Sequence, residues 1–102
     1  MKLYNENYPA PNPRKVRMFL AEKGLNVELV HVPMKDRAHK APDFLVKNSL
    51  GQLPVLETDD GRFICESIAI CRYLEELHPA KPLFGRTAFD KAMIEMWIKR
   101  VE

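Results

Sequence analysis

The sequence lacks a long apolar run and has little cysteine. No apolar stretch approaches the ~20 residues that a membrane-spanning helix needs, and the first residues, MKLYNENYPAP, contain no apolar signal-peptide core. The two cysteines, Cys65 and Cys71, have neither a CxxC motif nor a partnering histidine pair. These absences argue against a membrane protein, a disulfide framework and a zinc site. They favour a cytoplasmic protein in which both cysteines are small buried residues.

The sequence also lacks a strong excess of one charge. Its 16 basic and 14 acidic residues leave a formal charge of +2, and no basic stripe is interleaved with aromatic residues. This balance argues against nucleic acid as a partner. What is present, 46% hydrophobic against 29% charged residues over 102 positions, predicts one small globular unit with a real core.

Local patterns predict seven secondary-structure elements before residue 79. Asn12 is expected to be an N-cap, because Pro13 suits the first helical position and disfavours helical backbone at the residue before it. Gly24 supplies the stop of that helix, and Asp60-Gly61 is a hairpin signal. The predicted elements are strands at 2–5, 26–32, 54–57 and 62–65 and helices at 13–23, 43–47 and 66–78.

This order of elements is that of the thioredoxin-like fold, an α/β domain. The first crossover implies parallel neighbours and the hairpin adds an antiparallel edge, so we expect a mixed four-stranded sheet. The domain should occupy residues 1–79, with a linker at 80–86. A last helix at 87–102 is predicted because Thr87 and Asp90 resemble a capping box. Its apolar residues recur at helical spacing: Phe89, Met93, Met96 and Trp97.

The stretch GQLPVLE places a proline where a buried strand is expected. Leu53, Val55 and Leu56 have the apolar character of a strand, but Pro54 has no N–H to donate to a sheet ladder. A proline of this kind belongs at an edge, a strand start or a bulge. Either it only shapes a tight turn, or it marks a strand edge that has a use.

Three stretches together resemble the N-terminal domain of a cytosolic glutathione transferase: PNPRKVRMFLAEKGL, FLVKNSLGQLPVLETDDGRFICESIAICRYLEEL and MIEMWIKRVE. The first is most similar to a bacterial and fungal subgroup in which Pro-Asn-Pro opens the first helix. The resemblance implies glutathione as a co-substrate, no separate cofactor, a small electrophile as second substrate and a homodimer. It also implies that 87–102 is the first helix of an all-helical C-terminal domain that is otherwise missing, so that the chain is a fragment.

The resemblance implies that two short motifs, QLP and ES, bind glutathione. Pro54 is similar to a cis-proline, and Leu53 before it would pair through its main chain with the cysteinyl part of the tripeptide. Ser67, at a helix start, would hold the γ-glutamyl carboxylate, and Glu66 the adjacent ammonium. The alternative is that Ser67 is an ordinary N-cap and Glu66 complements the helix dipole.

Three further residues lie in positions like those that contribute to the glutathione site of related proteins. They are Gln52, Lys40 and His39, of which Lys40 would pair with the glycyl carboxylate. Because Lys40 and His39 fall in a polar loop, plain solvated charge is the alternative reading of both.

The group that would activate the glutathione thiol is not evident, because this sequence lacks the serine, cysteine or tyrosine that related transferases place there. Through the stretch VRMFLAEKG, the usual serine position falls near Ala10, the usual cysteine near Asn12 and a tyrosine near Glu6. We therefore expect the helix N–H groups, the Asn12 side chain and Tyr8 to stabilise the thiolate, with Asn12 alternatively a plain N-cap. Without a cysteine at these positions, glutaredoxin-like thiol exchange is disfavoured.

Two functions follow. The first is a glutathione transferase, in which these 102 residues alone are weakly active or inactive because the electrophile site lies largely on the helical domain. The second is a non-enzymatic module that binds other proteins, against which the intact QLP and ES motifs count. Met93, Met96 and Trp97 form an apolar patch that monomers seldom leave open, which supports a dimer.

Overall fold

The computed structural model describes residues 1–6, 11–33, 40–48, 51–80 and 82–101. These residues belong to two compact units, Met1–Cys71 and Arg72–Glu102, each of which is described by itself. Within the described residues no helix is long and apolar enough to cross a membrane.

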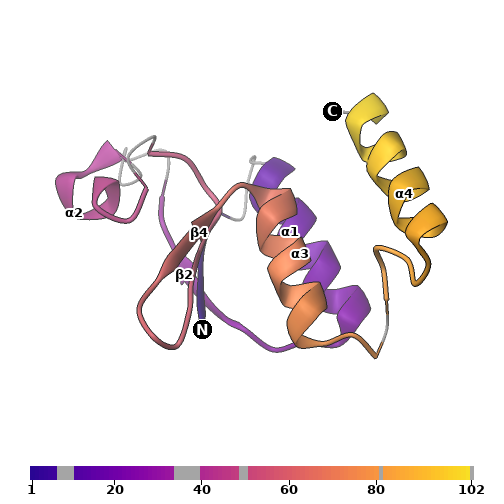
Figure 1. Cartoon of the computed structure of the whole chain (residues 1–102). Coiled ribbons are helices and arrows are strands. Elements are labelled where there is room, and N and C mark those ends of the chain that lie inside the picture. Colours follow the sequence, from indigo (N-terminus) through magenta and orange to yellow (C-terminus); the bar gives the residue numbers. More distant parts are fainter. Residues whose placement is uncertain (7–10, 34–39, 49–50, 81, 102) are drawn as a thin grey trace. The chain divides into compact units, whose positions relative to one another are not determined.

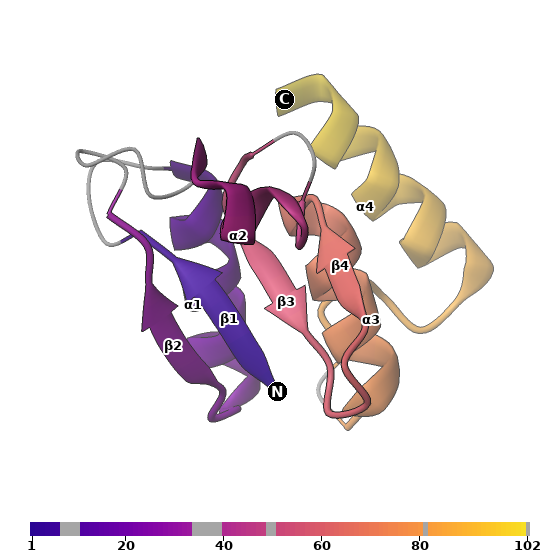
Figure 2. The same ribbon diagram turned by 90° about the vertical axis from the view of Figure 1, so that its left-hand side faces the viewer.

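The first unit is built on the mixed four-stranded sheet that the sequence predicts (Figures 1 and 2). Its strands are β1 (Lys2–Asn5), β2 (Glu28–His31), β3 (Val55–Glu57) and β4 (Phe63–Cys65), in the order β2-β1-β3-β4. β1 pairs with β2 in parallel and with β3 antiparallel, and β3 pairs with β4 antiparallel. The thioredoxin-like fold is thereby confirmed, although β2 is shorter than the predicted strand at 26–32.

Helices cover both faces of this sheet. In Figure 2, the short helix α2 (Pro42–Leu45) lies in front of the sheet and α1 (Pro11–Lys23) lies behind it. The alternation of side chains along a strand gives each face its own apolar set. One core cluster consists of Val32, Phe44, Leu53 and Val55, with Tyr4 and Cys65 packed against it. The other buried set includes Leu3, Val16, Leu20, Leu56 and Ile70.

α1 begins two residues earlier than predicted. Its first residue is Pro11, so Asn12 lies inside the first turn and the prediction that Asn12 is the N-cap was wrong. The first four N–H groups of a helix have no intrahelical acceptor, so Pro11 and Pro13 both fit this turn without losing a hydrogen bond. The predicted stop is confirmed: Gly24 has φ +69°, and its N–H donates to the Ala21 carbonyl.

The predicted hairpin between β3 and β4 is also confirmed. The Thr58 N–H donates to the Arg62 carbonyl at 2.8 Å, and Gly61 adopts the left-handed φ of +84° that glycine permits. α3 (Ser67–Leu77) follows β4 after a single residue, Glu66.

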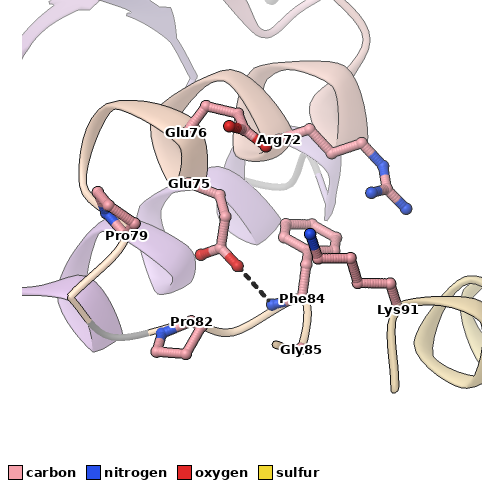
Figure 3. Close-up of a pocket in the computed structure, with 8 residues that line it drawn as sticks. All are labelled: Arg72, Glu75, Glu76, Pro79, Pro82, Phe84, Gly85 and Lys91. Atoms are coloured by element: carbon pink, nitrogen blue, oxygen red, sulfur yellow. Dashed lines mark hydrogen bonds between the residues drawn. The ribbon is translucent and has the colours of Figure 1, made fainter. Parts of the chain in front are cut away.

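The second unit consists of the end of α3, a linker and α4 (Ala88–Val101). The Glu75 carboxylate accepts hydrogen bonds from the main-chain N–H groups of Leu83 (3.1 Å) and Phe84 (2.7 Å), the second of which is drawn in Figure 3. The Arg72 guanidinium lies 4.6 Å from the centroid of the Phe84 ring and pairs with Glu95. These contacts fix the path of the linker.

A small cavity of about 220 Å³ lies beside this linker. Figure 3 shows the side chains that line it: Arg72, Glu75, Glu76, Pro79, Pro82, Phe84, Gly85 and Lys91. Beyond the linker, the Thr87 hydroxyl accepts a hydrogen bond from the Asp90 N–H at 3.1 Å, which confirms Thr87 as the N-cap of α4.

Candidate functional site at the sheet edge

Strand register brings the two predicted binding motifs to one end of the sheet. Val55 of β3 is the partner of Cys65 of β4, so the residues just before Val55 and just after Cys65 lie at the same edge. This edge is also the carboxyl end of the parallel pair β1 and β2, where Asn5 is the partner of His31. In open α/β sheets, ligands bind outside the carboxyl ends of parallel strands. The register alone therefore gathers Leu53-Pro54 and Glu66-Ser67 at a place suited to a ligand.

The main chain at Leu53 lies beside this edge. The Leu53-Pro54 peptide bond is cis, as the resemblance implied, and the Leu53 side chain is buried in the core cluster with Phe44. Within the described part of the chain, neither the N–H nor the C=O of Leu53 has a hydrogen-bond partner. An extended peptide could pair with these two groups as an added strand.

Glu66, and not Ser67, is the N-cap of α3. The Glu66 carbonyl accepts the first helical hydrogen bond, from the Ile70 N–H at 3.0 Å, and Glu66 has the non-helical φ of +72°. For a residue other than glycine, this left-handed conformation costs on the order of 1–2 kcal/mol, and such strain tends to cluster at functional sites. The alternative reading of Ser67 as an ordinary N-cap is therefore wrong.

Ser67 is buried, and its hydroxyl has no hydrogen-bond partner among the residues that the structure describes. Ser67 is 9% exposed at the first position of α3, and in the described residues no hydrogen bond is made by its side chain. Buried polar groups are nearly always hydrogen-bonded, so an unsatisfied hydroxyl requires an explanation. Because it stands beside the free N–H groups of a helix start, an anion could satisfy it.

The other predicted site residues are placed less fully. Gln52 is exposed and directly precedes Leu53, while Lys40 is exposed just before α2. Asn12 is exposed in the first turn of α1. Tyr8 and His39 lie outside the described residues.

Sequence reasoning missed two buried polar residues at this edge. The Asn48 side chain donates to the Gln52 carbonyl at 2.9 Å, and the Glu6 carboxylate lies 3.6 Å from Nδ1 of His31. Arg17 of α1 donates to the Glu6 carbonyl at 2.9 Å, which ties the helix to the end of β1. The available signal was a polar residue directly after a strand, for Glu6, or three residues after a short helix, for Asn48, in a position that the fold buries.

Neither cysteine is suited to be a nucleophile. Burial raises the pKa of the Cys71 thiol to about 11, against the smaller lowering effect of Lys15. Burial, and then the negative charge of Glu66, raises the pKa of Cys65. Both thiols are protonated at neutral pH, whereas the reactive form is the thiolate. Among the described residues, no group of three or more histidine, cysteine or acidic side chains could hold a metal ion.

The raised pKa of Cys71 predicts a loss of stability at alkaline pH. A group whose pKa is higher in the folded state stabilises it fully below the unfolded pKa, and this contribution is lost as pH rises towards about 11. Urea unfolding between pH 8 and pH 10 should therefore show a falling free energy of unfolding, with a shallower fall for Cys71→Ala. This range stays below most of the titration of Tyr4, whose pKa is raised to about 12. Equal slopes for the two proteins would contradict the prediction.

The chain resembles known proteins in both sequence and fold. Residues 10–77 match the family described as "Glutathione S-transferase, N-terminal domain". Glutathione S-transferase 2 of Saccharomyces cerevisiae is 43% identical over 94 residues, covering 90% of this chain and 40% of the yeast protein. Elongation factor 1-gamma 2 of Oryza sativa is 42% identical over 74 residues, covering 72% of this chain and 18% of that protein.

Solved structures agree with this likeness. The crystal structure of a glutathione S-transferase domain-containing protein from Marinobacter aquaeolei superposes with a TM-score of 0.94 at 38% identity. The match covers 100% of this chain and 50% of that one. The chain thus spans half or less of the length of these relatives.

Proposed function

Since this chain belongs to the glutathione S-transferase family through its N-terminal domain, we propose that the sheet edge binds glutathione and presents its thiolate to an electrophile. The observation that carries this proposal is that two groups at one edge have no hydrogen-bond partner among the described residues. These are the main chain of Leu53 and the buried hydroxyl of Ser67. A peptide with a terminal carboxylate satisfies both.

In this proposal each part of the tripeptide has its own partner. The cysteinyl main chain pairs with Leu53 as an added strand, and the γ-glutamyl carboxylate accepts from the Ser67 hydroxyl and the N-terminus of α3. Glu66 is exposed beside Ser67 and pairs with the γ-glutamyl ammonium. Gln52, Lys40 and His39 complete the site, with Lys40 facing the glycyl carboxylate.

The sulfur is proposed to lie at the N-terminus of α1. A free thiol has a pKa of ~8.5, so it needs stabilisation as the thiolate to react at neutral pH. The helix N-terminus, the Asn12 side chain and Tyr8 supply that stabilisation. The thiol proton passes to solvent, and the thiolate forms a carbon–sulfur bond with the electrophile. In this step it either displaces a leaving group, which departs with its electron pair, or adds to a polarised double bond, whose carbanion then takes a proton from water.

The 102 residues by themselves are expected to turn over slowly or not at all. In the resembling family, the electrophile site lies largely on the helical C-terminal domain, to which 87–102 would contribute a first helix. We propose that the chain consists of a glutathione-binding domain at 1–79, a linker at 80–86 and the first helix of a helical domain at 87–102. Robust conjugation of an aromatic electrophile by these residues alone would contradict this division of labour.

Titration calorimetry with three peptides tests the binding proposal. Glutathione and S-methylglutathione should both release heat and raise the melting temperature, because the proposed binding contacts are with the peptide and not with the sulfur. Cysteinylglycine lacks the γ-glutamyl carboxylate and should bind far more weakly. Absence of heat and of any thermal shift with millimolar glutathione would overturn the proposal.

A protein-binding module is the second candidate, and one observation favours it. A relative at 42% identity is named as an elongation factor and not as a transferase, so this N-terminal fold occurs in proteins named for another role. The same calorimetric experiment separates the candidates, since a pure interaction module need not bind glutathione.

We also propose that the protein forms a homodimer. Phe89 and Trp97 of α4 are 72% and 54% exposed, and their spacing places both on one side of the helix. Single exposed apolar residues are common, but a stripe of large ones favours a partner surface. Sedimentation of the protein as a monomer only would contradict this proposal.

A further inference from the structure

Lys47, two residues after the end of α2, approaches aromatic rings on two strands of the sheet that are not neighbours. Its Nζ lies 5.5 Å from the centroid of the Tyr4 ring on β1 and 5.6 Å from that of Phe63 on β4. β3 lies between these strands. Both distances are within the ~6 Å over which a cation is attracted to a ring face. The ammonium therefore fixes the end of α2 over the face of the sheet.

The ring on β1 is itself held in place. The Tyr4 hydroxyl donates to Oε1 of Glu57 at 2.6 Å, and its ring packs edge-to-face on Phe44 with centroids 6.1 Å apart. Phe44 belongs to α2 and is buried in the core cluster that also contains Leu53. Of the two rings that Lys47 faces, Tyr4 is thus held by its neighbours, whereas Phe63 is exposed at the surface.

Asn48 joins α2 to the chain that leads to the binding edge through hydrogen bonds on both sides. It is 7% exposed, and its N–H donates to the Phe44 carbonyl at 3.1 Å. Its side-chain Nδ2 donates to the Gln52 carbonyl at 2.9 Å, and its own carbonyl accepts from the Gly51 N–H at 2.9 Å. Two hydrogen bonds from one residue therefore fix the chain immediately before Leu53.

We propose that Lys47 and Asn48 are positioning residues for glutathione: Lys47 fixes the end of α2 on the sheet, and Asn48 holds Gln52 so that the Leu53 main chain faces the peptide. This inference rests on the proposed function. It assigns to the α2 segment a role in the affinity for glutathione that requires no contact with the thiol.

Three lysine variants test the first half of the inference by titration calorimetry. Lys47→Met keeps the length of the side chain but loses the charge, and it should weaken glutathione binding by roughly five- to thirtyfold, the range that two cation–π contacts correspond to. Lys47→Arg keeps a cation over the rings and should bind nearly as the unchanged protein does. Lys2→Met is the matched control, because Lys2 is exposed at the opposite end of β1.

Asn48→Ala tests the second half, with an expected loss of affinity of about tenfold. In the full-length protein, both variants should raise KM for glutathione and leave kcat unchanged, since positioning of the peptide is lost before any step at the sulfur. Amide hydrogen exchange gives a reading that needs no ligand. Exchange at Gly51, whose N–H donates to the Asn48 carbonyl at 2.9 Å, should accelerate in both variants, while exchange at Leu56 in the core stays the same.

The outcomes separate the two proposals. If the unchanged protein does not bind glutathione, the proposed function falls, and hydrogen exchange at Gly51 still decides whether Lys47 and Asn48 position this edge. Unchanged exchange there in Lys47→Met, or an equal loss of affinity in Lys47→Arg, would overturn the inference. Faster exchange throughout Met1–Cys71 would also overturn it, because the role would then be general stability.

Discussion

Replacing Ser67 by alanine is expected to weaken glutathione binding by about 10- to 100-fold with almost no loss of stability. A hydrogen bond to a charged group contributes about 1.5–3 kcal/mol, which corresponds to this range. The hydroxyl is buried at the first position of α3 and has no partner in the described protein, so its removal breaks no bond in the unliganded fold. The loss should therefore appear only when the γ-glutamyl carboxylate is present.

Thr87→Ala is the matched control, because the Thr87 hydroxyl caps a helix N-terminus within the protein itself. Its Oγ1 accepts a hydrogen bond from the Asp90 N–H at 3.1 Å as the N-cap of α4. Its loss should cost about 1 kcal/mol of stability and leave the affinity for glutathione unchanged. Calorimetry and urea unfolding of both variants give the complete pattern. A Ser67→Ala protein that is less stable but binds glutathione as before would show that Ser67 is structural.

The sheet could be predicted from sequence because each strand carries its own signal. The apolar character of Val55 and Leu56 indicated β3, and the Asp60-Gly61 signal indicated the hairpin to β4. The register of that hairpin determines which residues meet at the edge. The juxtaposition of Leu53 with Glu66 and Ser67 thus follows from local chemistry. The identity of the ligand, glutathione, was inferred from the family resemblance, because the spacing of apolar residues does not specify a ligand.

The helix starts could not be predicted equally well, because side-chain preferences compete with the path of the chain. Asn12 and Ser67 are both strong N-cap residues by preference, yet the structure begins α1 at Pro11 and uses Glu66 as the cap of α3. β4 ends at Cys65, so the single residue Glu66 must make the turn into the helix, at φ +72°. Tertiary geometry therefore overrode local preference, and it did so at the candidate site.

The role of Asn48 was hidden for a different reason. Its side chain bonds to a main-chain carbonyl four residues further on, and such a bond depends on the shape of the turn and not on the identity of Gln52. Lys47 is similar, since the two rings it faces come from strands that are far apart in the sequence. Contacts of these kinds leave no spacing pattern in a single sequence.

Replacing Glu75 by alanine should have the largest effect on stability, a loss of about 3 kcal/mol in the free energy of unfolding. The carboxylate is 9% exposed and accepts the main-chain N–H groups of Leu83 at 3.1 Å and Phe84 at 2.7 Å. Truncation leaves these donors without their acceptor, and each unsatisfied buried donor costs about 1–3 kcal/mol. Phe84 is buried, so water cannot easily replace the lost oxygen.

Glu75→Gln and Glu76→Ala separate the hydrogen bonds from the charge. The amide of Glu75→Gln keeps one oxygen acceptor, so its loss of stability should be about half that of Glu75→Ala. Glu76 is the exposed neighbour on the same helix, and its removal should change stability by less than about 0.5 kcal/mol. Urea unfolding measures all three. If Glu75→Ala and Glu76→Ala lowered the free energy of unfolding by the same small amount, the buried carboxylate of Glu75 would have no special role in fixing the linker between α3 and α4.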